Sequence, residues 1–227
     1  MLFLIEKTDI EFRQKAEKAY NDLIFFLKSN RSRMSKVVKM NQSGDVYLPA
    51  KLIGQEYSDL IYGFVDIKRS RKDIAHGRIT KAFYAKGKKD TSKHWIVFPV
   101  IKTIEDLQRL ENLIEFRSFV HEYNHFLDEK RRKKPSLPKV GVEPYEKYSN
   151  SPEEFNAHAQ EAFAQLEKDV KSMSEEQKYV LFQHGYKKFL KKLLTYFDEN
   201  FLDSLNDENH KRLLRRSYDL FNALKQE

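Results

Sequence analysis

The five residues His121-Glu122-Tyr123-Asn124-His125 combine side chains that metal-dependent hydrolysis uses. On an α-helix, residues four positions apart share a face, so both histidines can point at one metal ion. Neutral imidazole is a common ligand of zinc. Glu122, directly after the first histidine, could take a proton from a water molecule held by that metal. The spacing predicts two ligands and a general base on one helix; the alternative is two solvated histidines on an amphipathic helix.

A catalytic zinc ion usually has three protein ligands and one open position, so a third ligand must be sought downstream. The metzincin extension of the motif needs Gly at position 128 and His at position 131. This chain has Asp128 and Arg131 there, which excludes that class. We expect Glu154 as third ligand, because it lies on a second helix after a loop that can fold this helix back across the first. Glu153 and His158 are alternatives, and Glu154 could instead only close an N-terminal capping box.

The elements that must position these residues are helices around a short run of strands. Helical spacing of apolar residues predicts helices at residues 9–29, from Thr103 through the motif, at 151–171, and from Ser174 and Asp207 onward. Branched and aromatic runs predict strands at residues 46–48, 60–67, 79–85 and 95–101, and an extended segment at 36–40. Pro99 cannot donate to a ladder, so the last strand should lie at an edge or be bulged. We expect an α+β fold with a small, mainly antiparallel sheet packed on the motif helix.

Composition limits the size and the metal chemistry of the protein. A chain of 227 residues, 40% of them hydrophobic, can form one large domain with a helical annex. We expect a domain at residues 1–171 with an N-terminal helix, and a C-terminal helical extension at 172–227 that packs on it. The chain has no cysteine, so a metal must be bound by histidines and carboxylates.

The N-terminal stretch Met1–Ile5 is apolar, but Glu6 and Lys7 end it. It lacks the basic start and the apolar length of a signal peptide, and no run approaches the length of a membrane-spanning helix. We therefore expect a cytoplasmic protein without a membrane partner. A phage-encoded chain would lie in the host cytoplasm or the virion.

The motif and the downstream segment together resemble the gluzincin branch of the zincin-like metallopeptidases. They are similar to small H-E-x-x-H proteins of bacteria and bacteriophages, in which a Tyr-x-x-x-Pro-x-Glu-x-x-Ala segment follows the motif helix. The matching residues are His121, Glu122, His125, Tyr148, Pro152, Glu154 and Ala157. The resemblance covers residues 60–165, including Ala75-His76-Gly77 and the strand at 95–101. It implies a zincin-like fold, a catalytic zinc ion, and an edge strand that holds an extended peptide substrate.

If the chain is such a peptidase, its site residues take the following roles, with Tyr148 and His158 chosen by their proximity in the sequence. The implied zinc ligands are His121, His125 and Glu154. Glu122 would take a proton from the zinc-held water and pass it to the leaving amine. Tyr148 and His158 are candidates to stabilise the oxyanion. Asp128 could orient a ligand imidazole, or be an exposed residue of the helix.

Basic clusters at residues 68–72, 130–134 and 187–192 and a net charge of +8 allow a nucleic-acid partner if the clusters share one surface. Such runs are usually solvated faces. The other two hypotheses are a noncatalytic phage or bacterial interaction protein on the same fold, and a nucleic-acid-associated protein. An intact Glu122 favours the peptidase, because a structural metal site needs no base. Four isolated histidines are expected to be structural or exposed: His76, His94, His184 and His210.

Overall fold

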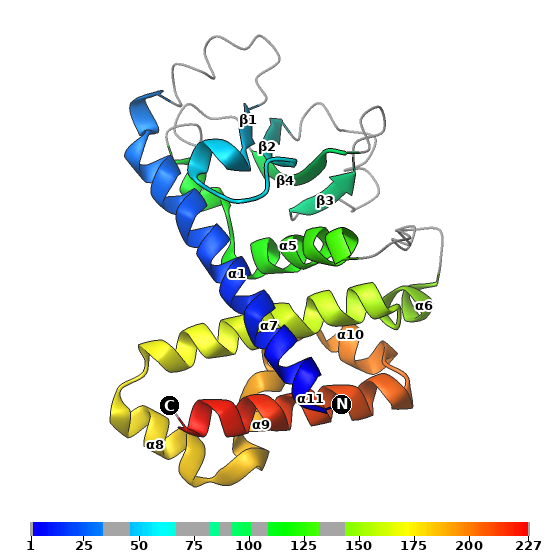
Figure 1. Cartoon of the computed structure of the whole chain (residues 1–227). Helices are drawn as coiled ribbons and strands as arrows, with labels where there is room; N and C mark the ends of the chain where they lie inside the picture. The colour runs from blue at the N-terminus through cyan, green and yellow to red at the C-terminus, as the bar shows by residue number, and fades with distance from the viewer. Residues whose placement is uncertain are drawn as a thin grey trace. The chain divides into compact units, whose positions relative to one another are not determined.

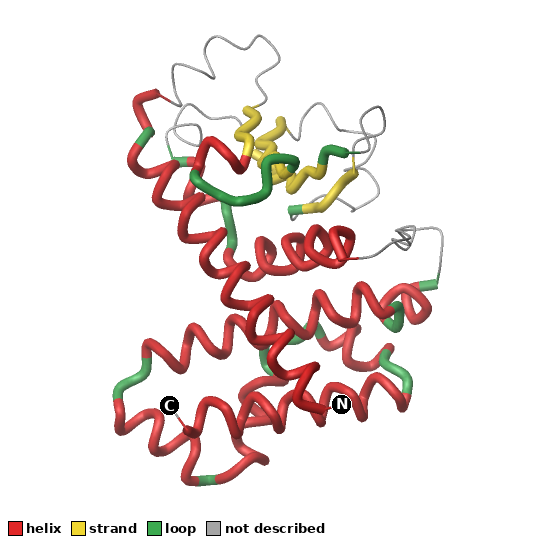
Figure 2. The backbone as a smooth tube through the Cα atoms, viewed as in Figure 1, coloured by secondary structure: helices red, strands yellow, loops and turns green. Residues whose placement is uncertain are grey.

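A computed structural model describes residues 2–33, 46–66, 82–86, 92–100, 109–131 and 144–226 of the chain. These residues form one small sheet and many helices, so the fold is α+β and mostly helical, as predicted (Figures 1 and 2). Several predicted features lie outside the described residues: the extended segment at 36–40, the basic cluster at 68–72, Ala75-His76-Gly77, and Thr103.

The chain forms two compact units. The sheet unit comprises residues 15–126, and the helical unit comprises residues 1–14 and 127–227. Helices α1 (Leu2–Ser29) and α5 (Phe116–Arg131) contribute residues to both units. We predicted a domain boundary after residue 171, which lies inside the helical unit. The assignment of residues 1–171 and 172–227 to separate domains stays a prediction.

The sheet has four strands in the order β1-β2-β4-β3. Their bounds are β1 Val46–Pro49, β2 Leu60–Asp66, β3 Phe83–Lys86 and β4 His94–Val100. The outer pairs β1–β2 and β3–β4 are antiparallel, whereas the central pair β2–β4 is parallel. The described sheet is therefore mixed: two of its three strand pairs are antiparallel, in line with the prediction, and the central pair is parallel, because the connection from β2 to β4 passes through the edge strand β3.

Strand β4 lies inside the sheet, so its predicted edge position is wrong. Pro99 pairs in register with Val65 of β2. The pairing of β4 with β3 ends at Val97, which lies opposite Phe83. Pro99 thus stands beyond the last described pair with β3.

One face of the sheet lies against α5 (Figure 1), and aromatic rings fill the contact. Tyr62 of β2 and Phe98 of β4 both stack on Phe119, with ring centroids 6.0 and 6.3 Å apart. Each of these three side chains is buried. Successive side chains of a strand point to opposite faces of the sheet, so each strand contributes apolar residues to one face. This face packs on the apolar stripe of the motif helix.

The helical unit is built around α7 (Pro152–Ser172). The other helices of this unit are α6 (Tyr145–Ser149), α8 (Glu175–Gln183), α9 (Gly185–Leu194), α10 (Glu199–Ser204) and α11 (Asp207–Gln226). Its core is rich in phenylalanine: Phe155, Phe163, Phe189, Phe197, Phe201 and Phe221. The predicted capping box of Ser174 and Gln177 is confirmed.

The helices after α7 differ from the prediction in one break and one cap. The helix expected from Ser174 is broken into α8 and α9, because Gly185 adopts a left-handed conformation with φ of 72°. The last helix begins at Asp207 as expected, but its cap is Asn206, whose Oδ1 accepts the N–H of Asn209 at 2.9 Å.

Helix α1 begins at Leu2, not at residue 9, so the apolar start of the chain lies in its first turns. The helix is 28 residues long. None of the described helices combines the length and apolar character that crossing a membrane requires.

Candidate functional site

Helix α5 carries the H-E-x-x-H motif on one continuous stretch, as predicted. Its apolar side is buried through Phe119, Val120 and Phe126. The Nε2 atoms of His121 and His125 lie 3.2 Å apart, with ring centroids 4.9 Å apart and ring planes at 72°. The two imidazoles therefore converge on one point beside the helix.

The convergence of the two histidines suits a shared metal ion. Two nitrogen ligands at tetrahedral angles on a zinc ion, each about 2.0–2.1 Å away, are about 3.3–3.4 Å from each other. The observed Nε2–Nε2 distance of 3.2 Å is close to this value. The same distance also suits an N–H···N hydrogen bond between the rings.

Glu122 is held against the edge of the sheet. Its Oε2 accepts a hydrogen bond of 2.7 Å from the backbone N–H of Tyr84 in β3. In the strand order of the described sheet, β3 is an edge strand with β4 as its neighbour. The carboxylate expected to act as base is thus oriented by the strand next to the motif helix.

Tyr84 also connects the motif to a polar pair, buried His94 and half-buried Asp59, that the sequence analysis did not identify. Its ring stacks on that of His125, with centroids 6.4 Å apart. Its hydroxyl lies 2.6 Å from Nδ1 of His94, and Nε2 of His94 lies 3.6 Å from Asp59. Sequence analysis predicted that His94 is either structural or exposed. His94 is 5% exposed, so the structural alternative applies.

The sequence contained one signal for His94. The residue shares the parity of Ile96 and Phe98, so it faces the same side of the sheet as these buried side chains. A polar residue at a core position usually has a specific partner. The partner Tyr84 could not be found from spacing, because it comes from the register of another strand.

Glu154 stands in the first turn of α7. Ser151 caps this helix and accepts the backbone N–H of Glu154 at 3.3 Å, with Pro152 at the first helical position. Glu154 and its neighbour Glu153 are 3% and 5% exposed. Both carboxylates are far more buried than a helix needs for capping alone, so the capping role does not account for their position.

Two groups of described side chains have ligand types and spacing that could hold a metal ion. The ligand atoms of each group lie within 4.8 Å of one another. The first group is His121, His125 and Glu154; the second is His121, His158 and Glu161. The first agrees with the predicted ligand set and contains Glu154 rather than Glu153.

The remaining candidates are less directly placed. His158 is half-buried, lies 3.7 Å from Glu161, and packs on Phe201 with ring centroids 4.3 Å apart. Tyr148 is half-buried in α6, and Asp128 is half-buried one turn after His125. Their roles at the oxyanion or behind a ligand stay predictions.

Tyr123, inside the motif, faces away from the histidines. Residues two positions apart on a helix point in nearly opposite directions, and Tyr123 is 2% exposed. Burial, and then the nearby Tyr57 and Glu56, raise the pKa of its hydroxyl far above the ordinary value. It therefore stays neutral and serves the packing of α5.

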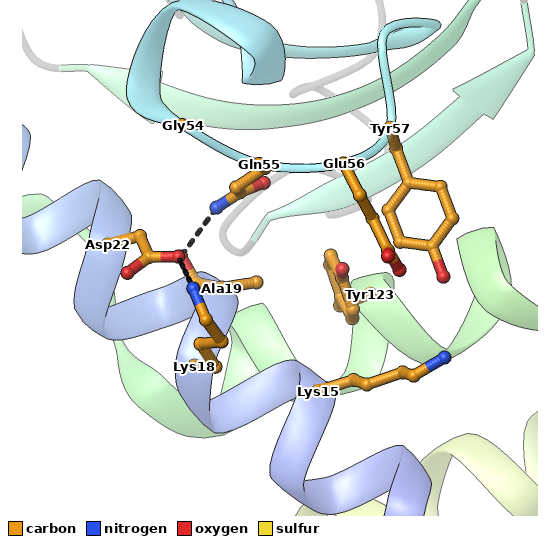
Figure 3. A pocket seen from close by; sticks show the side chains of 9 residues that line it. All are labelled: Lys15, Lys18, Ala19, Asp22, Gly54, Gln55, Glu56, Tyr57 and Tyr123. Atoms are coloured by element: carbon orange, nitrogen blue, oxygen red, sulfur yellow. Dashed lines mark hydrogen bonds and ion pairs between the residues drawn. The ribbon is translucent and has the colours of Figure 1, made fainter.

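A pocket of about 320 Å³ lies on this other side of the helix (Figure 3). Lys15 and Lys18 of α1, Glu56 and Tyr57 of the loop before β2, and Tyr123 of α5 line it. Because it is on the Tyr123 side, it is separate from the side on which the histidines converge.

Comparisons with known proteins return no relatives. No protein-family model and no curated protein matches the sequence. No solved structure matches the fold. The functional argument therefore depends on the geometry of the chain's own residues.

Proposed function

We propose that the chain is a zinc-dependent peptidase of the gluzincin type, on a zincin-like fold. The proposed metal ligands are His121, His125 and Glu154, and the proposed general base is Glu122. The observation that carries the proposal is the convergence of the two histidine Nε2 atoms, 3.2 Å apart, on the helix that also carries Glu122. Two imidazoles and one carboxylate are a ligand set of catalytic zinc sites.

The residues of the motif divide the chemistry between them. A bound zinc ion supplies Lewis acidity, which polarises the scissile carbonyl and lowers the pKa of water. Glu122 takes the proton of the attacking water and passes it to the leaving amine. The Tyr84 N–H that donates to Glu122 keeps this carboxylate oriented. Tyr148 and His158 are the proposed oxyanion donors.

The proposed substrate is an extended segment of a peptide or protein. In the described sheet β3 is an edge strand, and an edge can pair with an added strand through main-chain hydrogen bonds. The contact of Tyr84 with Glu122 places this edge next to the proposed base. A peptide paired with β3 would therefore present its backbone close to the motif.

Metal analysis of purified variants tests the ligand assignment. We expect zinc to bind in a one-to-one ratio, and His121→Ala and His125→Ala each to lose it. His210→Ala is the matched control, because His210 is an exposed histidine of α11. Zinc binding that survives both motif substitutions would overturn the proposal.

The substitution Glu122→Gln separates the peptidase from a noncatalytic metal protein. We expect this variant to keep its zinc and to lose at least about a hundredfold in peptide hydrolysis, the usual size of a general-base contribution. Hydrolysis of casein-derived or combinatorial peptides provides the assay. A rate that does not respond to Glu122→Gln would contradict the proposed mechanism.

A further inference from the structure

Three side chains from three parts of the sheet unit form a partly buried polar chain beside α5. Asp59 precedes β2, His94 opens β4, and Tyr84 lies in β3. The backbone also joins the first two, since the N–H of His94 donates to the carbonyl of Asp59 at 2.9 Å. Tyr84 and His94 are diagonal neighbours on one face, because Tyr84 pairs with Ile96 and Lys86 pairs with His94.

The geometry assigns a direction to this chain of contacts. The carboxylate of Asp59 beside Nε2 favours the His94 tautomer with its proton on that nitrogen. Nδ1 then accepts the hydroxyl proton of Tyr84 at 2.6 Å. The ring of Phe126 packs edge-on against His94, with centroids 5.3 Å apart, and limits its rotation.

Tyr84 transmits this fixed position to the motif by two contacts. Its ring stacks on His125, and its backbone N–H holds Glu122. Each contact depends on where β3 lies along α5. The hydroxyl bond to His94 anchors the same residue from its far end.

We propose that Tyr84, anchored by the Asp59–His94 pair, is a positioning residue that orients His125 and Glu122 for metal binding and proton transfer. This inference rests on the proposed function. Residues that orient metal ligands without touching the metal typically contribute 10–100-fold to metal affinity. A hydroxyl deleted from a merely structural tyrosine would not change that affinity.

Zinc affinity of Tyr84→Phe, measured with a competing chelator, tests the proposal. We expect the dissociation constant for zinc to be roughly tenfold larger than in the wild type, and the visible spectrum of the cobalt(II)-loaded protein to change. Tyr62→Phe is the matched control. Tyr62 belongs to the same sheet, and its hydroxyl donates an equally short hydrogen bond of 2.6 Å to Gln55. Equal zinc affinity of the two variants would overturn the inference.

Substitutions of His94 provide a rescue test. His94→Asn keeps an acceptor near the position of Nδ1, whereas His94→Leu removes it. We expect His94→Leu to weaken zinc binding at least as much as Tyr84→Phe, and His94→Asn to recover part of the loss. No difference between the two His94 variants would contradict the role of the hydroxyl bond.

Hydrogen exchange of the residue-84 amide distinguishes failure of this inference from failure of the proposed function. This amide donates to Glu122 without any metal. We expect about tenfold faster exchange in Tyr84→Phe than in Tyr62→Phe, whether or not zinc binds. If wild-type protein binds no zinc, the proposed function fails; if exchange at residue 84 is unchanged, the positioning role fails.

Discussion

At the scale of single residues, α5 buries a polar imidazole group on one side and an aromatic side chain on the other. His125 is 5% exposed and converges with His121, whereas Tyr123 is buried on the opposite side of the same helix. A buried imidazole needs a partner for each ring nitrogen. Under the proposed function, a shared metal ion would be this partner on one side of the helix, and aromatic packing occupies the other side.

The choice between Glu154 and Glu153 can be tested directly. We expect Glu154→Gln to weaken zinc binding by more than the 10–100-fold typical of residues behind a ligand, and Glu153→Gln to leave it nearly unchanged. Both substitutions remove one negative charge from the first turn of α7, so their effects on helix stability should match. Zinc titration of the pair measures the difference; the reverse order would exchange the two assignments.

Buried tyrosines of the sheet unit predict a loss of stability in alkali. Burial raises the pKa of Tyr20, Tyr62 and Tyr123 above the ordinary value of 10.0. Below pH 10 both states hold these protons; above it only the folded state does, so the free energy of unfolding falls as pH rises. A fully buried group such as Tyr62 or Tyr123 contributes at most about 1.4 kcal/mol per pH unit between its unfolded and folded pKa values.

Urea unfolding of Tyr123→Phe between pH 9 and pH 11, set against the wild type, measures this contribution. We expect a shallower fall in the free energy of unfolding above pH 10, because one titrating hydroxyl is gone. Tyr179→Phe, at a 65% exposed position of α8, is the control and should keep the wild-type slope. An unchanged slope in Tyr123→Phe would contradict the raised pKa.

At the scale of elements, short devices set where helices begin, end and dock. Ser151 and Ser174 cap α7 and α8 through their hydroxyls, and Gly185 separates α8 from α9. Within the helical unit, Arg13 of α1 donates to Glu167 of α7 at 2.5 Å and to Gln160 at 3.3 Å. These contacts, rather than helix propensity, decide where each element stops and what it contacts.

The buried ion pair predicts an asymmetric mutational response. Arg13 is 6% exposed, so Arg13→Ala would leave Glu167 without its charge partner and cost about 2–4 kcal/mol. Arg13→Leu combined with Glu167→Leu should cost less, because no charge then stays buried alone. Lys18→Ala, in the exposed Lys18–Asp22 pair, should cost less than about 0.5 kcal/mol. Chemical unfolding provides the measurement, and equal costs for the two pairs would be inconsistent with burial.

Gly185 predicts a smaller, backbone effect. Its φ of 72° is unfavourable for a residue with a Cβ, so Gly185→Ala should lower the free energy of unfolding by about 1–2 kcal/mol. Space is not the cause, since no atom lies within 4 Å of a Cβ built there. Lys187→Ala, at an exposed position of α9, is the control and should be nearly neutral.

At the scale of the whole molecule, each unit has its own apolar core, whereas the positive net charge is a property of the full chain. The helical unit has a continuous phenylalanine-rich core, and the sheet unit has an aromatic layer between its sheet and α5. The net charge of +8 belongs to the full chain and favours nonspecific contact with polyanions. Lys187, Lys188 and Lys191 are exposed on α9 and supply part of this charge.

The nucleic-acid hypothesis can be separated from the peptidase proposal by salt. We expect retention of mixed-sequence DNA at about 50 mM salt to disappear by about 200 mM, as for nonspecific charge attraction. Replacing the three exposed α9 lysines by glutamate should lower this retention and leave zinc binding unchanged. DNA binding that persists at the higher salt and depends on these lysines would favour a nucleic-acid-associated protein.

Local geometry made much of the candidate site predictable. The four-residue spacing of His121 and His125 needs only a helix to bring them together, and apolar periodicity predicts that helix. The capping box at Ser174 and strands β1, β2 and β4 follow equally from neighbouring residues. Even the α+β class follows from the order of such patterns along the chain.

Contacts between distant residues decided the rest. The parallel pairing of β2 with β4 places β4 inside the sheet, and its register with β3 brings Tyr84 to His94 and to the motif helix. Spacing along the chain carries no information on strand order or on diagonal neighbours, because those depend on which strands pair. The sequence by itself determined the two histidines and the carboxylate of Glu122 on one helix; only the tertiary structure decided which side chains hold them in place.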